Sequence, residues 1–115
     1  MTVYGLSQST GVERLLEVER SDAGIVLRAR DSADGKDRET IVVPVDDVIA
    51  SLTEQPAGGT TIEATSAAYG TPRQLDLEVR GNEVLLQVRP ESAGWDVAVG
   101  LDDFQDAIEA VADAA

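Results

Sequence analysis

Two aspartate pairs are the most conspicuous candidates for carboxylate chemistry in this sequence. They open the stretches VDDVIASL at 45–52 and LDDFQDAI at 101–108. Four carboxylates brought together could bind a metal ion or act as general acid and base. However, apolar residues at helical spacing follow each pair, and Pro44 or Gly100 precedes it. We therefore expect each pair to begin a helix, one aspartate as the N-cap and the other in the first turn.

Other catalytic chemistry has few residues available. The chain has no histidine and no cysteine, which excludes Ser–His and Cys–His pairs, disulfides and zinc sites built on those ligands. The acidic loop at 31–39 does not place its oxygens at the alternate positions of a calcium loop. No phosphate-binding or dinucleotide-binding glycine motif occurs. We expect no catalytic, cofactor or metal site, and a protein that is not an enzyme. Carboxylate chemistry or a small ligand in a groove between two halves of the chain is a further alternative.

Arginines and the one tryptophan supply the remaining candidate contacts. Arg28, Arg30 and Arg89 are predicted on strand faces, where they could contact nucleic-acid phosphates or pair with nearby acids. Single-strand binders also stack bases on aromatic side chains, but aromatics make up only 3% of the chain. Trp95 begins a predicted strand. It could mark a contact with a partner, or it could cover the end of the core.

Composition describes the environment more than the activity. The 115 residues suit a single domain, and 22 acidic against 9 basic residues give a net charge of −13. Such a charge repels nucleic acids and anionic membranes at low salt. It resembles the surfaces of proteins from salt-loving archaea, where molar salt shortens the Debye length to about 3 Å. A GC-rich bacterial genome, or a basic partner, would also account for it.

No membrane or export segment is predicted. The N-terminal MTVYGLSQST has neither the basic start nor the apolar run of a signal peptide. No apolar stretch approaches the roughly 20 residues that span a membrane. We expect a cytoplasmic protein.

The chain also reads as one pattern written twice. Residues 14–30 align with 73–89, and 41–52 align with 97–108. Each copy predicts an alternating strand, a turn, a second strand, a loop, a third strand and a helix. Folding the two hairpins at their turns places Glu17 opposite Arg28 and Asp76 opposite Gln87.

These patterns predict an α+β fold of two β-β-β-α units packed about a pseudo-two-fold axis within one domain, 1–115. The units cover about 1–54 and 60–115, joined by the linker 55–59. The third strands are ETIVVPV and WDVAVGL, and alternation at 2–6 and 61–65 could add a fourth strand to each unit. The helices are expected to pack on sheet faces built from Leu16, Val18, Ile25, Leu27, Leu75, Leu77, Val84 and Leu86.

This order of elements resembles the Whirly and PC4-like single-strand DNA-binding superfamily. The resemblance is topological and spans nearly the whole chain. It implies a nucleic-acid-binding protein, with Arg28, Arg30 and Arg89 as phosphate contacts, although the net charge departs from that of a DNA binder. The leading expectation is a non-enzymatic binding or regulatory module, self-associating as a homodimer through exposed edge strands or binding a protein partner.

Overall fold

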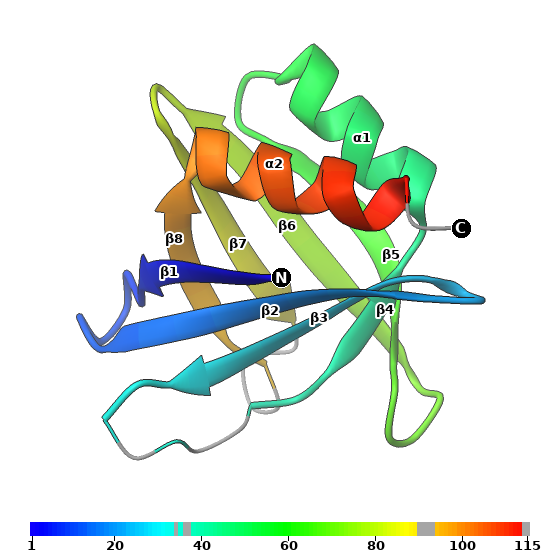
Figure 1. Cartoon of the computed structure of the whole chain (residues 1–115), viewed down its shortest axis with the longest axis horizontal. Helices are drawn as coiled ribbons and strands as arrows, with labels where there is room; N and C mark the ends of the chain where they lie inside the picture. Colours follow the sequence, from blue (N-terminus) through cyan, green and yellow to red (C-terminus); the bar gives the residue numbers. More distant parts are fainter. Residues whose placement is uncertain (34, 36–37, 90–93, 114–115) are drawn as a thin grey trace.

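The computed structural model describes residues 1–33, 35, 38–89 and 94–113, and it shows a closed antiparallel β-barrel (Figure 1). Eight strands follow one another around the barrel in chain order, and the eighth pairs with the first. Two helices are attached, α1 (Val45–Glu54) after the fourth strand and α2 (Leu101–Ala112) after the eighth. The strands are β1 (Thr2–Leu6), β2 (Glu13–Ser21), β3 (Gly24–Asp31), β4 (Ile41–Val43), β5 (Thr60–Ser66), β6 (Pro72–Arg80), β7 (Glu83–Arg89) and β8 (Asp96–Gly100).

The predicted α+β class, with two β-β-β-α units that each pack a helix on their own sheet, is wrong. β4 pairs with β5, and β8 pairs with β1, so that all eight strands form one continuous sheet. Alternation in a sequence reports which face of a strand is buried, but not which strand lies beside it. Closure also gives every strand a neighbour on both sides, which removes the exposed edges through which we expected two copies to pair.

The individual elements were predicted more accurately than their assembly. Strands form at Thr2–Leu6 and Thr60–Ser66, where alternation suggested an additional strand. The two predicted third strands are shorter than expected, at Ile41–Val43 and Asp96–Gly100. The order of strands and helices is the expected one, while the internal repeat itself stays a prediction.

Both predicted hairpins form in the predicted register. Glu17 faces Arg28 across β2 and β3, and Asp76 faces Gln87 across β6 and β7. At the second hairpin the chain turns at Gly81, whose φ of 59° lies in the left-handed region that favours glycine. The hairpin turns therefore fix which side chains point into the barrel.

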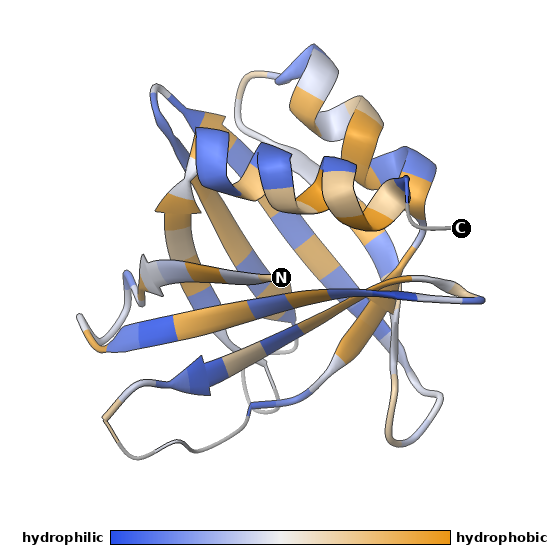
Figure 2. Ribbon diagram, viewed as in Figure 1, coloured by the Kyte–Doolittle hydropathy of each residue, from blue (hydrophilic) through white to orange (hydrophobic). Residues whose placement is uncertain are grey.

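The core lies inside the barrel and beneath the helices. Each of the eight inward-facing positions expected from the sequence is at most 2% exposed. Burying an aliphatic side chain of this kind stabilises the fold by about 1.5–3 kcal/mol. Figure 2 shows polar and apolar bands alternating along the strands, and the apolar sides of both helices turned toward the sheet. These positions are Leu16, Val18, Ile25, Leu27, Leu75, Leu77, Val84 and Leu86.

The helices complete this core unequally. α2 buries Phe104, Ala107, Ile108 and Val111, the stripe that its spacing predicts. α1 buries Val48 and Leu52, but Ile49, one of the apolar residues at helical spacing in VDDVIASL, is 41% exposed. In Figure 1, α2 crosses the sheet with α1 beside it, and contacts of α2 reach β1, β2, β7 and β8.

The aspartate pairs begin the two helices, but the predicted capping is wrong. Pro44 and Gly100 are the N-cap residues, and neither helix has a side-chain capping hydrogen bond. Both aspartates of each pair lie in the first turn instead. Proline and glycine offer no side-chain acceptor, so the carboxylates act only through their charge near the positive helix end.

Candidate functional site

The three predicted arginine contacts lie on the outer faces of two different hairpins. Arg28 and Arg30 both form ion pairs with Glu17, the second at 3.7 Å between Nη1 and Oε1. Arg89 pairs with Asp76 at 2.7 Å between Nε and Oδ2. Each guanidinium therefore faces a carboxylate. The structure does not bring the three arginines together as one row.

Trp95 lies at the end of the core. It is only 4% exposed, and its indole Nε1 donates a hydrogen bond to the carbonyl oxygen of Glu39 at 2.6 Å. This contact ties the residue before β8 to the segment that leads into β4. Of the two interpretations of Trp95, its position matches the one in which it covers the core.

A buried arginine cluster lies nearby that sequence reasoning did not find. Arg14, at the start of β2, is 5% exposed, and its Nε donates to Asp31 Oδ1 at 2.9 Å. Its Nη1 donates to the Asp96 carbonyl at 2.6 Å and to Oδ1 of the same residue at 3.3 Å. Arg38 binds the other side of Asp31. We call Arg14, Asp31, Arg38 and Asp96 the arginine plug.

The topology explains where the plug lies. In an antiparallel barrel the starts of β2 and β8 and the end of β3 share one end. Both helices begin at the other end, after β4 and β8. The plug therefore closes the end opposite the helix starts. A cation inside this low-dielectric region needs such partners, because desolvating an unpaired charge is costly.

Asp96 also binds the loop between β1 and β2 through hydrogen bonds. Its carboxylate accepts hydrogen bonds from the hydroxyls of Ser7 and Ser9, at 2.9 and 2.7 Å, and from the backbone N–H groups of Gln8 and Ser9. Burial would raise the pKa of Asp96, but the hydrogen bonds from Ser9, Ser7 and Gln8 outweigh it and leave the pKa below its usual value. Hydrogen bonds from Arg38 and Arg14 likewise lower the pKa of Asp31 despite its burial.

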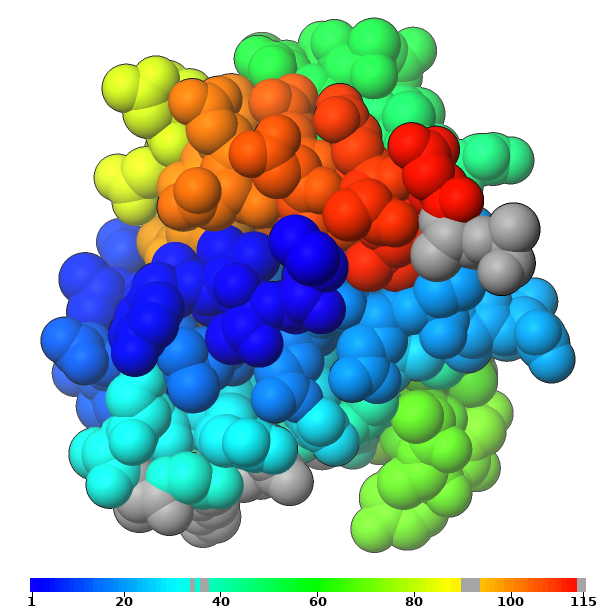
Figure 3. Space-filling view, in the orientation of Figure 1, coloured from blue at the N-terminus to red at the C-terminus, as the bar shows by residue number. Residues whose placement is uncertain are grey.

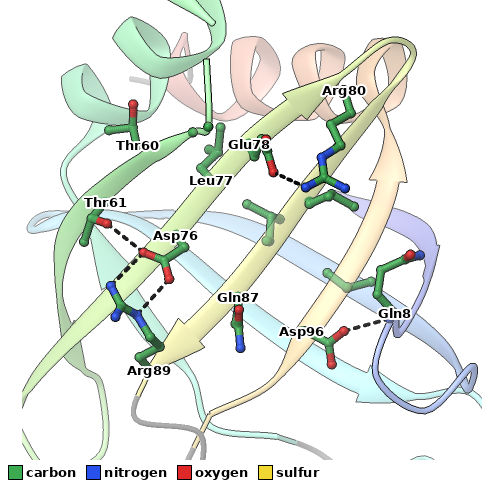
Figure 4. A pocket seen from close by; sticks show the side chains of 15 residues that line it. Gln8, Thr60, Thr61, Asp76, Leu77, Glu78, Arg80, Gln87, Arg89 and Asp96 are labelled. Carbon is green, nitrogen blue, oxygen red and sulfur yellow. Dashed lines mark hydrogen bonds and ion pairs between the residues drawn. The ribbon is translucent and has the colours of Figure 1, made fainter. Parts of the chain in front are cut away.

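One hollow is a groove on the outer face of β5 to β8, lined by both polar and apolar residues (Figure 4). It has a volume of about 480 Å³. Its charged groups satisfy one another: Asp76 accepts from Thr61 and Arg89, and Glu78 pairs with Arg80 at 2.9 Å. These groups therefore do not point at an open position for a ligand.

A second hollow lies where the barrel closes between β1 and β8, and its surface is mostly apolar. Tyr4 and Leu6 point outward and are 70% and 49% exposed. Leu6 faces Ala98 of β8, which in turn faces Leu85 of β7, so the apolar side chains form a continuous row across three strands. We call Tyr4, Leu6, Ala98 and Leu85 the seam patch. Figure 3 shows β1 at the surface of the molecule on this face.

Close approach of β1 to β8 shapes this hollow. A Cβ atom at Gly5 would lie 2.5 Å from the carbonyl oxygen of Ala98, so a larger residue there would force β1 and β8 to shift apart. The hollow has a volume of about 430 Å³, and Ala98, only 5% exposed, lies beneath its larger neighbours. Aromatic and aliphatic side chains around a concavity are the usual anatomy of a protein-binding surface.

The pairing of β4 with β5, where the two halves of the chain meet a second time, provides a comparison within the same molecule. There β4 meets β5 with the same two-pair register, Ile41 to Ser66 and Val42 to Thr65. The outward residues of β5 at the positions matching Leu6 and Tyr4 are Thr65 and Glu63, both exposed and polar. Next to them, Val42 and Val26 are apolar and half-buried, as Leu85 is at the first seam. The two seams therefore differ in the exposed apolar side chains that β1 contributes.

The signal for the seam patch was present in the sequence. The segment TVYGL has apolar residues on both faces, Val3 inward and Tyr4 and Leu6 outward. The corresponding segment TTIEATS alternates as a half-buried strand should. An alternation that fails on the outer face indicates an exposed apolar surface.

No other kind of site is evident among the described residues. They contain no group of three acidic side chains close enough to hold a metal ion, although residues 34, 36 and 37 of the acidic loop lie outside the described part. Neither helix has the length and apolar character to cross a membrane. Comparison with known proteins gives no match to a family model, a curated protein or a solved structure.

Proposed function

We propose that the protein is a non-enzymatic interaction module that binds a protein partner through the seam patch. The observation that carries the proposal is the outward exposure of Tyr4 and Leu6 over a hollow whose floor is Ala98. Large apolar side chains in such a position cost solubility, and aromatic residues at the centre of an interface commonly contribute most of its binding energy. We place this module in an acidic, salt-rich cytoplasm, which the net charge of −13 supports.

Contact with single-stranded nucleic acid was the alternative expectation, and no observation in the structure favours it. Arg28 and Arg89 form ion pairs with Glu17 and Asp76 across their hairpins, which offsets their attraction for phosphate. Trp95 is buried, so it cannot serve as a stacking platform. The proposal therefore rests on the seam patch alone.

A selection experiment tests the proposal without knowing the natural partner. Displayed peptides that bind the full chain would be isolated, and their affinities measured for the unaltered protein and for Tyr4→Ser/Leu6→Ser. We expect the variant to weaken binding about tenfold or more, since losing an interface hot spot costs about 2 kcal/mol. The matched control is Ile49→Ser, because Ile49 is also an exposed apolar residue, at 41%, but lies on α1 outside the patch.

The two variants separate a specific surface from general stickiness. Selected peptides that bind Tyr4→Ser/Leu6→Ser as tightly as the unaltered chain would contradict the proposal. Equal losses in the patch variant and in Ile49→Ser would also contradict it, because they would indicate nonspecific adsorption to exposed apolar residues.

A further inference from the structure

The rim of the seam patch is acidic. Glu13 of β2 lies opposite Leu6, and Glu83 begins β7 on the other side of the seam. Both glutamates line the hollow, both are exposed, and no lysine or arginine lines it. Among the described residues neither has an ion-pair partner, and Arg80, which faces Glu83 across the hairpin, pairs with Glu78 instead.

We infer that the seam patch takes an extended, cationic segment of a partner protein, with an apolar side chain in the hollow and a lysine or arginine on either side. This inference rests on the proposed function and adds the chemistry of the partner. Two unpaired carboxylates beside an apolar centre offer electrostatic complementarity to such a segment. The net charge of −13 would steer it to the protein from a distance.

The register of the strands sets the spacing of the partner's charges. β1 and β8 lie between β2, which carries Glu13, and β7, which carries Glu83. Neighbouring strands are about 4.8 Å apart, so three steps across the sheet cover about 14 Å. Glu83 pairs with Gly100 rather than with Ala98, so it also lies two residues, about 7 Å, along the strand, and the two glutamates are about 16 Å apart. An extended chain advances about 3.3 Å per residue, and alternate side chains share a face. Five residues span about 13 Å, and the long side chain of a lysine or arginine at each end covers the remaining few Å. The complementary pattern is therefore cation, any residue, apolar residue, any residue, cation.

A second copy of this chain fits the surface less well. Symmetric docking places the same patch on both sides of the contact, which brings Glu13 and Glu83 of each copy toward those of the other. No cation lines the hollow to pair with them. Each copy also contributes a charge of −13. Like charges across an interface oppose binding.

Three synthetic peptides test the inference on the full chain by isothermal titration and by amide chemical-shift mapping. The first carries the Lys-x-Leu-x-Lys pattern among serines, the second replaces both lysines by glutamine, and the third replaces the leucine by serine. We expect the first to bind most tightly, to shift the amides of Leu6 and Ala98, and to weaken in molar KCl as charges are screened.

Protein variants isolate the role of the rim. Glu13→Gln/Glu83→Gln should weaken the first peptide roughly tenfold, as expected for two ion pairs at the edge of an interface. The matched control Glu19→Gln/Glu63→Gln removes the same charge from two other exposed strand positions and should have a smaller effect.

The outcomes separate the two levels of the argument. If the lysine and glutamine peptides bind the seam patch with equal affinity, the inference that the partner is cationic is wrong, while the proposed function is unaffected. Binding of the serine peptide as tight as that of the first would overturn the apolar anchor. The proposed function fails as well if none of the three peptides changes the amide chemical shifts of the seam patch and if the selected peptides bind Tyr4→Ser/Leu6→Ser as tightly as the unaltered chain. A dimer that forms through Tyr4 and Leu6 would replace the partner by a second copy.

Discussion

Replacing Arg14 by methionine tests how much the arginine plug contributes to the stability of the barrel. Arg14→Met keeps much of the apolar length of the side chain but removes the guanidinium from Asp31; the two side chains are only 6% and 8% exposed. Removing one partner of a buried ion pair typically costs 3–5 kcal/mol, because the other charge stays buried without compensation.

The surrounding contacts place the expected loss near the lower end of that range. Asp31 keeps Arg38, and Asp96 keeps the hydroxyls of Ser7 and Ser9. We therefore expect Arg14→Met to lower the free energy of unfolding by about 3 kcal/mol, measured by urea denaturation with an unchanged m value.

A surface ion pair provides the control. Arg89 and Asp76 pair across β6 and β7 with side chains 43% and 34% exposed, so Arg89→Met should cost less than about 1 kcal/mol. In the double variant Arg14→Met/Asp31→Asn, the loss of unfolding free energy should be smaller than the sum of the losses in the two single variants. The reason is that the Asp31 carboxylate, which Arg14→Met leaves without its partner Arg14, is also removed. A loss in Arg14→Met no larger than that in Arg89→Met would refute the reasoning that burial makes this cluster important.

Three further predictions concern stability. The lowered pKa values of Asp31 and Asp96 contribute stability that is complete above their ordinary pKa of about 3.8 and is lost as pH falls through the lower folded values. The urea concentration at the midpoint of unfolding should therefore decline when it is measured from pH 6 downward. This decline should be smaller in Asp96→Asn, which lacks one of the two carboxylates. Gly5→Ala should cost about 1–3 kcal/mol because its Cβ would meet the Ala98 carbonyl at 2.5 Å, whereas Gly100→Ala, with its nearest neighbour at 3.4 Å, should be close to neutral. Molar KCl should raise the urea midpoint by screening a net charge of −13; an unchanged midpoint would argue against adaptation to salt.

Local patterns in the sequence predicted the inward faces and the hairpin registers, because both depend on neighbours close in the chain. Leu16 and Leu86 are buried as alternation requires, and Glu17 faces Arg28. Closure could not be predicted in the same way. The pairing of Leu6 with Ala98 joins segments from opposite ends of the chain, and no periodicity encodes such a neighbour.

The candidate site was missed for a related reason. The sequence directed attention to arginines on strand faces, yet Arg28 and Arg89 form ion pairs with acids across their own hairpins. The sequence places Arg14 at the start of a strand but does not indicate its burial, which depends on Asp31 and Asp96 meeting it at one end of the barrel. Only the seam patch had a readable signal, the apolar outer face of β1 at Tyr4 and Leu6.

Closure of the barrel through its first and last strands has a consequence for folding. The hairpins β2–β3 and β6–β7 join neighbouring segments and can form early, whereas β1 meets β8 through only two residue pairs, Gly5–Val99 and Leu6–Ala98. Contacts so distant in the chain form slowly, because the entropy of closing the loop opposes them. During synthesis β1 has no partner for its second edge until β8 leaves the ribosome. Until then this edge is open to intermolecular strand pairing, so the growing chain is most prone to aggregation there.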